Sequence, residues 1–270
     1  MSSSSNPEWT ELIATSKRDI AEALTTGSDG SIYIAGHTGG FLGGQTKFGD
    51  SADNDAFISK YNPDGTIAWT RVLGTSSRDT GNALTTGSDG SIYIAGYTAG
   101  DLNGQTNSDS GDAFISKYNP DGTIAWTGLL GSTDNNDIAQ ALTTGSDGSI
   151  YIAGSVRDDF DGQINSGDGD AFISKFNPDG TKEWTRLLGS SEHDAGYALT
   201  TGSDGSIYIA GNTYGDLGGQ TTNGWQDAFI SKYNPDGTNE WSRLLGSSGK
   251  DFGFALTKGN DGSIYIAGST

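Results

Sequence analysis

The chain has 270 residues and carries 15 Lys and Arg against 34 Asp and Glu, which gives a formal net charge of −19. A surface this acidic repels the phosphates of nucleic acids, so nucleic acid is not expected as a partner. Cysteine is absent and the apolar runs are short, so the sequence excludes a disulfide framework and predicts no membrane insertion.

The chain begins with Met1-Ser-Ser-Ser-Ser-Asn6, which lacks the charged start and apolar core of a secretory signal. The first predicted element is a short strand, Trp9-Thr-Glu-Leu-Ile-Ala14. A hairpin is predicted over 23–36, because its two halves are rich in β-branched residues and the Gly-Ser-Asp-Gly between them favours a tight turn.

A long loop over 37–54, rich in Gly, Asp and Asn, separates the hairpin from the next predicted strand, Asp55-Ala-Phe-Ile-Ser-Lys-Tyr61. Its side chains alternate between two faces, as in a strand. Asn62-Pro-Asp-Gly-Thr66 has the residues of a β-turn and leads to the next Trp strand, at Trp69. One period of the sequence therefore holds four short antiparallel strands.

The hairpin recurs along the chain at intervals of 57 to 60 residues. Its five copies start at Ala23, Ala83, Ala141, Ala198 and Ala255. A four-stranded meander repeated with this period is typical of a β-propeller blade, and a β-solenoid is the rival architecture.

The number of strands predicts the size of the propeller. The third strand of the period occurs four times and the others five times, which predicts an all-β, five-bladed propeller over 1–270. The fifth blade lacks a full third strand and is closed by the N-terminal Trp strand. The predicted units are 15–74, 75–131, 132–189 and 190–246, with 247–270 plus 1–14 forming the closing blade. We expect a monomer, and strand exchange into oligomers is the alternative, because an unpaired strand edge invites pairing between chains.

The unit Asp-Ala-Phe-Ile-Ser-Lys-Tyr-Asn-Pro-Asp-Gly-Thr, followed by the Trp strand and by Asp-Gly-Ser-Ile-Tyr-Ile-Ala-Gly, resembles the bacterial SBBP-type β-propeller repeat. The resemblance runs from about Trp9 to Gly268. It implies a bacterial extracellular or cell-surface protein, often part of a longer chain, and it brings no catalytic residues. The near-identity of the units also suits recent amplification or an engineered, idealised propeller.

Candidate ligand-binding residues lie in the long loops between the second and third strands. A Gln follows a Gly in four of these loops, at Gln45, Gln105, Gln163 and Gln220. Variation confined to one face is a common way for repeat proteins to build a binding surface. Trp225 occurs in one loop alone and is a candidate contact for a ligand or partner, although a lone exposed apolar residue needs no special explanation.

Two series of Asp recur at strand starts, and the meander places both on the long-loop face. One precedes the hairpin, at Asp79, Asp137, Asp194 and Asp251, and the other opens the third strand, at Asp55, Asp112, Asp170 and Asp227. Carboxylate oxygens of this kind are ligands for Ca²⁺. The alternative, which we favour, is that each Asp caps a turn by accepting backbone N–H groups.

The sequence contains no motif for catalysis. There is no Cys nucleophile, no phosphate-binding loop and no His cluster, since His37 and His193 lie in unlike places. We therefore expect a non-enzymatic binding scaffold without a cofactor, apart from the Ca²⁺ alternative, that binds a protein or, in a multivalent manner, a glycan. The rival hypotheses are a structural or engineered module without a ligand and an enzyme module with its site at the central channel.

Overall fold

The structure, a computed structural model, describes residues 9–49, 53–108, 110–133 and 135–270 and consists of β-strands with one short 3₁₀ helix, η1 (Leu42–Gly44). No helix among these residues is long and apolar enough to cross a membrane.

The strands form four four-stranded antiparallel sheets and one two-stranded sheet. The first sheet contains β1 (Asp19–Thr26), β2 (Ile32–Thr38), β3 (Asp55–Tyr61) and β4 (Ile67–Leu73). The second contains β5 (Asp79–Thr86), β6 (Ile92–Thr98), β7 (Asp112–Tyr118) and β8 (Ile124–Leu130). The third contains β9 (Ile138–Thr144), β10 (Ile150–Val156), β11 (Asp170–Phe176) and β12 (Lys182–Leu188). The fourth contains β13 (Asp194–Thr201), β14 (Ile207–Thr213), β15 (Asp227–Tyr233) and β16 (Asn239–Leu245), and the last contains β17 (Phe252–Lys258) and β18 (Ile264–Ser269).

The second and third sheets bury both of their faces, because each packs between two neighbouring sheets. The register pairs Tyr33 with Lys60 and Lys60 with Trp69, so these side chains share one face of the first sheet. That face packs on the second sheet, where Ile94 and Phe114 are fully buried. The same pairing of faces recurs between the second and third sheets and between the third and fourth.

The repeated Trp residues fasten one sheet to the next. The Trp69 ring stacks on Tyr118 with its centroid 6.4 Å away, and its Nε1 donates a hydrogen bond to the Pro120 carbonyl oxygen at 3.2 Å. Trp126 and Trp184 donate to the equivalent proline carbonyls of the third and fourth sheets. These side chains therefore belong to the packing between sheets, where large aromatic surfaces contribute most.

The repeated Lys residues of the third strands form ion pairs. The Lys60 ammonium lies 3.3 Å from an Asp29 carboxylate oxygen, and that of Lys175 lies 2.7 Å from Glu183. Lys60 also lies over the Tyr33 ring, with its Nζ 5.5 Å from the centroid.

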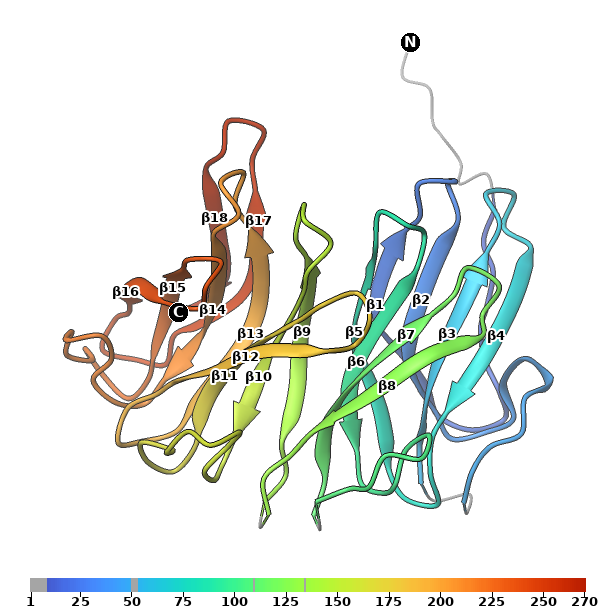
Figure 1. Ribbon diagram of the computed structural model, residues 1–270, viewed down its shortest axis with the longest axis horizontal. Helices are drawn as coiled ribbons and strands as arrows, with labels where there is room; N and C mark the ends of the chain where they lie inside the picture. The colour runs from blue at the N-terminus through green and yellow to red at the C-terminus, as the bar shows by residue number, and fades with distance from the viewer. Residues whose placement is uncertain (1–8, 50–52, 109, 134) are drawn as a thin grey trace.

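The sheets stand in a row, with the first strand of each lying beside the first strand of the next: β1 beside β5, then β9, β13 and β17. Figure 1 shows β17 and β18 at one end of this row and the first sheet at the other. No comparable contact joins β17 to β1 in the described chain. The predicted closure into a five-bladed ring is therefore not formed in this structure.

The prediction of an N-terminal strand at residues 9–14 is also wrong. Residues 9–15 have no ladder partner, and Trp9 instead stacks on Tyr61 and donates to the Pro63 carbonyl oxygen at 3.3 Å. This is the contact that Trp69 makes with the second sheet. In the complete sheets the fourth strand pairs with the third strand. The last sheet has no third strand beside β18 among the described residues, so the Trp9 segment finds no strand edge there to pair with.

The two edges of the row differ in their connections. One edge carries the short hairpin turns, which are nearly the same in every unit. The other carries the long loops together with the links that precede the first strand of each sheet. Among the described residues, parallel bridges join loop to link at three of the four boundaries, as between Gly169 and His193. The predicted placement of both kinds of connection on one edge is thus confirmed.

Candidate functional site

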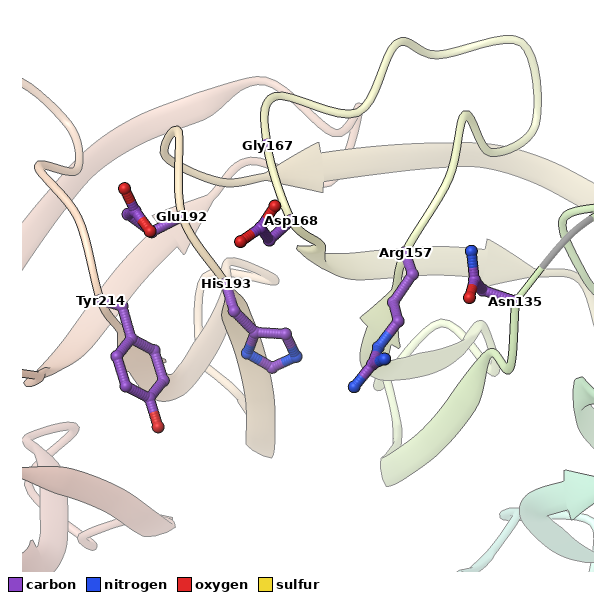
Figure 2. Close-up of a pocket in the computed structure, with 7 residues that line it drawn as sticks. All are labelled: Asn135, Arg157, Gly167, Asp168, Glu192, His193 and Tyr214. Carbon is purple, nitrogen blue, oxygen red and sulfur yellow. The ribbon is translucent and has the colours of Figure 1, made fainter.

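A pocket of about 730 Å³ opens on the long-loop edge between the third and fourth sheets. Its lining residues come from loops and links rather than from strand centres: Asn135, Arg157, Gly167, Asp168, Glu192, His193 and Tyr214. Figure 2 shows Arg157, His193 and Tyr214 extending in the same direction from their backbones into open space.

Each of these side chains is positioned by the end of a regular strand. Arg157 directly follows β10 and Tyr214 directly follows β14, whereas His193 directly precedes β13. The Tyr214 N–H donates to the His193 carbonyl oxygen at 3.1 Å, and the two rings meet edge to face with centroids 6.1 Å apart. The strand ends therefore hold the aromatic wall of the pocket in place.

The charged groups of the pocket are free to meet a ligand. Arg157, Asp168 and Glu192 make no side-chain ion pair or hydrogen bond with the described part of the chain. Burial lowers the pKa of His193, and the nearby Arg157 charge lowers it further, so the imidazole is neutral at pH 7. The pocket thus offers a cation, two carboxylates, a neutral imidazole and a phenol, which together can donate and accept several hydrogen bonds.

The predicted ligand-binding glutamines lie in loops of the same edge, and two of them use their side-chain amides for hydrogen bonds within the protein. Gln220 donates to the Ser242 carbonyl oxygen at 2.7 Å and accepts from the Leu244 N–H at 3.2 Å. Gln163 makes the same pair of bonds to Thr185 and Leu187. Their amide groups fasten the loop to the outermost strand of the same sheet. A ligand role for the four glutamines stays a prediction.

Trp225 lies at the boundary between the fourth sheet and the two-stranded sheet, and its side chain is 74% exposed. The backbone N–H of Trp225 donates to the Gly249 carbonyl oxygen, which fixes the backbone while the indole lies in solvent. It is not among the lining residues of the pocket, and its role as a contact stays a prediction.

The two Asp series meet in pairs at the sheet boundaries, on either side of a Gly-Thr or Gly-Ser step. At the first boundary the Asp55 carboxylate packs against Gly74, so closely that a side chain on Gly74 would place its Cβ 2.7 Å from Asp55 Oδ1. The next residue, Thr75, donates its N–H to Asp79 Oδ2 at 2.7 Å. Asp55 in turn accepts the Phe48 N–H at 2.6 Å. Each carboxylate therefore accepts a backbone N–H group, as the capping alternative requires.

The same arrangement recurs at the other boundaries. Backbone N–H groups of the long loops are accepted by Asp112, Asp170 and Asp227, and those of the links by Asp137, Asp194 and Asp251. Desolvation by burial raises the pKa of Asp137 and of Asp194 to about 6. No group of three or more His, Cys, Asp or Glu suited to a metal ion occurs among the described residues. Metal binding by these Asp residues stays a prediction.

The pocket residues were missed by sequence reasoning, although a signal for them existed. The position after the second strand holds Gly39, Ala99, Arg157 and Tyr214 in successive units, while the hairpin before it is unchanged. His193 was noted, but its contact with Tyr214 depends on packing between sheets. Variation at single positions within otherwise identical units would have pointed to this site.

The comparisons with known proteins agree with this architecture. The family profile described as SBBP, beta-propeller repeat, matches residues 183–218. These residues are an SBBP-type β-propeller repeat. Nearly the same stretch recurs in the other units, with the period of the row of sheets.

Two curated relatives are similar to part of the chain. Regulatory protein FlaEY of Caulobacter vibrioides is 31% identical over 180 residues, which are 59% of this chain and 18% of FlaEY. An uncharacterized WD repeat-containing protein of Acanthamoeba polyphaga mimivirus is 33% identical over 103 residues, which are 34% of this chain and 7% of that protein. The chain therefore spans less than a fifth of the length of either relative.

Solved structures support the propeller-like fold alone. Virginiamycin B lyase from Staphylococcus aureus, as a catalytically inactive variant with quinupristin, has a TM-score of 0.53 at 17% identity and covers 96% of this chain and 66% of its own. A protein of unknown function from Dyadobacter fermentans has a TM-score of 0.57 at 13% identity and covers 95% and 77%. At such low identity neither resemblance extends to function.

Proposed function

We propose that the protein is a non-enzymatic binding scaffold that recognises carbohydrate through the pocket between the third and fourth sheets. The observation that carries the proposal is the contrast between units. The fold repeats with almost the same residues, yet this one boundary gathers Arg157, His193 and Tyr214, which the other units do not carry at these positions. The fold does not require these side chains, so a ligand is the physical reason that we give for them.

The chemistry of the pocket suits a hydroxyl-rich ligand. Sugar hydroxyls donate and accept hydrogen bonds, and the pocket provides donors on Arg157 and acceptors on Asp168 and Glu192. The Tyr214 side chain is 41% exposed, which leaves one ring surface for the apolar face of a sugar. A planar aromatic beside several converging polar groups is a common way to fix both the orientation and the identity of a small ligand.

The alternatives are an enzyme module with its site at the channel and a structural module without a ligand. One structural neighbour is a lyase, so this kind of fold can carry an enzyme. Within the described pocket, no hydrogen bond links the His193 side chain to a nucleophile, and such a link is the usual sign of an activated one. This favours binding over catalysis. We further propose that the protein acts outside a bacterial cell or at its surface, where glycans are exposed.

Glycan-array binding followed by calorimetry tests the proposal. The substitutions Arg157→Ala and Tyr214→Gly introduce the residues that other units carry at the same position, Ala99 and Gly39, so the fold should tolerate both. We expect each to weaken binding of the best glycan at least tenfold. Trp225→Ala is the matched control, and its affinity should stay within twofold.

Two results would contradict the proposal. A glycan that binds equally well to all three variants would place recognition elsewhere on the long-loop edge. An array without any bound glycan would favour the structural module.

A further inference from the structure

A second cavity, of about 320 Å³, lies between the first three sheets on the long-loop side. It is lined by two residues of the first sheet, Glu22 and His37, and by residues of the next two sheets and their links: Arg78, Thr80, Asn82, Tyr97, Asn136, Ile138 and Gln140. None of these residues lines the pocket between the third and fourth sheets. The two cavities are therefore separate sites.

The lining positions vary among units whose neighbouring residues are unchanged. The position of His37 is Tyr97, Ser155 and Asn212 in the following units, although Ile-Ala-Gly precedes it each time. The position of Arg78 likewise changes, to Asn136 in the next unit. Since other side chains satisfy the fold at both positions, His37 and Arg78 are not needed for it.

His37 is buried with an unsatisfied polar atom. Its side chain belongs to β2, not to a loop, and the residue is 6% exposed. Its Nδ1 has no hydrogen-bond partner within the described residues, and the nearest carboxylate oxygen, on Glu22, is 3.8 Å away. Buried polar atoms are nearly always paired, so a group missing from the structure is expected to meet this nitrogen.

Arg78 is a cation without a counter-ion in a strongly acidic protein. Its guanidinium has no carboxylate within 4.0 Å among residues 9–49, 53–108, 110–133 and 135–270. Arg71 and Arg186 differ, since each donates to backbone carbonyls and lies over a Trp ring. Like Arg157 in the other pocket, Arg78 therefore lines a cavity without an ion pair to the described residues, and its charge is available to an anionic ligand.

The remaining groups of the cavity are neutral hydrogen-bonding side chains. The Tyr97 hydroxyl donates to Asn136 Oδ1 at 3.2 Å, and Asn82 donates to the Ala139 carbonyl oxygen at 2.8 Å. Glu22 is the one acidic side chain in the lining, and it disfavours a doubly charged anion through like-charge repulsion.

We propose that this cavity binds a small ligand with one carboxylate and several hydroxyls, of the sugar-acid class, with the carboxylate on Arg78 and a hydroxyl on His37. A planar carboxylate matches the fork of a guanidinium and forms two parallel hydrogen bonds with it. The imidazole Nδ1 then gains its missing partner, and Glu22 accepts from a second hydroxyl.

The experiment uses D-glucuronate as the probe, titrated by calorimetry into the full chain. The substitutions Arg78→Asn and His37→Asn introduce the residue that other units carry at the equivalent positions, Asn136 and Asn212, so the fold should tolerate both. We expect Arg78→Asn to weaken glucuronate binding at least tenfold and His37→Asn at least threefold. Lys250→Asn is the control, because Lys250 occupies the position of Arg78 in the last unit and lines neither cavity.

Three results would overturn the proposal: no glucuronate binding at millimolar concentration, equal binding of D-glucose, or equal affinity of Arg78→Asn and the Lys250→Asn control. Tighter binding of inorganic phosphate than of glucuronate would also overturn it. The Arg157→Ala variant should bind glucuronate normally, so this site and the proposed glycan pocket can fail independently.

Discussion

At the scale of single residues, the boundary Asp side chains combine a favourable bond with an unfavourable charge. Asp194 is fully buried, and its Oδ2 accepts the Ser190 N–H at 2.7 Å and the Ser190 hydroxyl at 3.0 Å. Desolvation nevertheless raises its pKa to about 6. Hydrogen bonds to an ionised carboxylate stabilise it, but here they do not offset the loss of water.

The two effects can be separated at Asp194. Asp194→Asn keeps an oxygen acceptor and removes the buried charge, so we expect the free energy of unfolding at pH 7.5 to rise by about 1–2 kcal/mol. Asp194→Ala removes the acceptor as well and leaves the Ser190 N–H unsatisfied, which should lower stability by about 1–2 kcal/mol relative to Asp194→Asn. Urea unfolding measures both, and equal stabilities for the two variants would contradict the capping role.

Acidification should stabilise the protein before it destabilises it. Burial raises the pKa values of Asp55, Asp137 and Asp194 from 3.8 to about 6, so the folded state binds more protons than the unfolded state between these values. The free energy of unfolding should therefore rise as the pH falls from 7.5 towards 5. His37 and His193 oppose this effect. Burial lowers their pKa values, so the unfolded state binds protons at these residues before the folded state does, and stability falls as the pH falls.

Six boundary carboxyl groups have raised pKa values and two imidazoles have lowered ones, so we expect a higher melting temperature at pH 5.5 than at pH 7.5. Calorimetry at the two pH values measures it, and Asp194→Asn should reduce the difference. A melting temperature that falls steadily below pH 7.5 would show that the buried carboxylates do not dominate.

Calcium provides a further test at the same residues. Because every boundary Asp is used as a cap, we expect equal melting temperatures in chelator and in millimolar Ca²⁺. If the Asp pairs instead bind Ca²⁺, the metal raises the melting temperature by mass action. Asp79→Asn and Asp137→Asn should then lose part of that rise, and such a loss would establish the metal site.

At the scale of elements, the long loops are held to their sheets by side chains rather than by ladders. The Gln220 amide bonds both Ser242 and Leu244 of β16, and Gln163 does the same on β12. A loop with such an anchor presents its tip in one conformation. The β12 strand is itself fixed to the fourth sheet by the Trp184 hydrogen bond to the Pro235 carbonyl oxygen, so the loop that Gln163 anchors is held by the packing of the row.

Removing the anchor should therefore cost stability. We expect Gln220→Ala and Gln163→Ala each to lower the free energy of unfolding by about 1–2 kcal/mol, because two backbone groups lose their partners. Gln105→Ala is the control, since Gln105 is exposed and no side-chain hydrogen bond is formed by it in the described chain. Thermal unfolding of the three variants decides the matter. A loss of glycan affinity without a loss of stability would instead support the original prediction that these glutamines contact ligand.

At the scale of the whole molecule, stability is a sum over boundaries between sheets, as in other repeat proteins. The Trp9 segment covers part of the free face of the first sheet, where the Trp9 and Tyr61 ring planes are only 11° apart. The other end of the row has no such cover, and Tyr265 of β18 is 55% exposed, whereas the equivalent Tyr33 is 2% exposed.

Trp9→Ala should accordingly destabilise the first sheet. We expect a loss of about 1–3 kcal/mol, below that of a fully buried Trp because Trp9 is half-buried. Trp225→Ala is the control and should change stability by less than about 0.5 kcal/mol, since its side chain lies in solvent. Hydrogen exchange of β3 and β4 amides measures the effect locally. Unchanged protection in Trp9→Ala would contradict docking of the N-terminal segment on this sheet.

The sequence by itself determined the strands of the five sheets, their order within each sheet and the division of the connections between two edges, whereas the strand predicted at Trp9 was wrong. These features depend on local chemistry: β-branched alternation at Ile32 and Ile34, Asp-Gly turns, and a period that brings like residues to like places.

Only the tertiary structure decided how the row ends and where unlike residues meet. Closure depends on how sheets pack on one another and on a third strand beside β18, so the pattern around Trp9 could not reveal that its segment docks without pairing. The two cavities were hidden for a similar reason. Arg157 and His193 are far apart in the sequence, and they meet because stacking of the third sheet on the fourth brings the end of one strand beside the start of another.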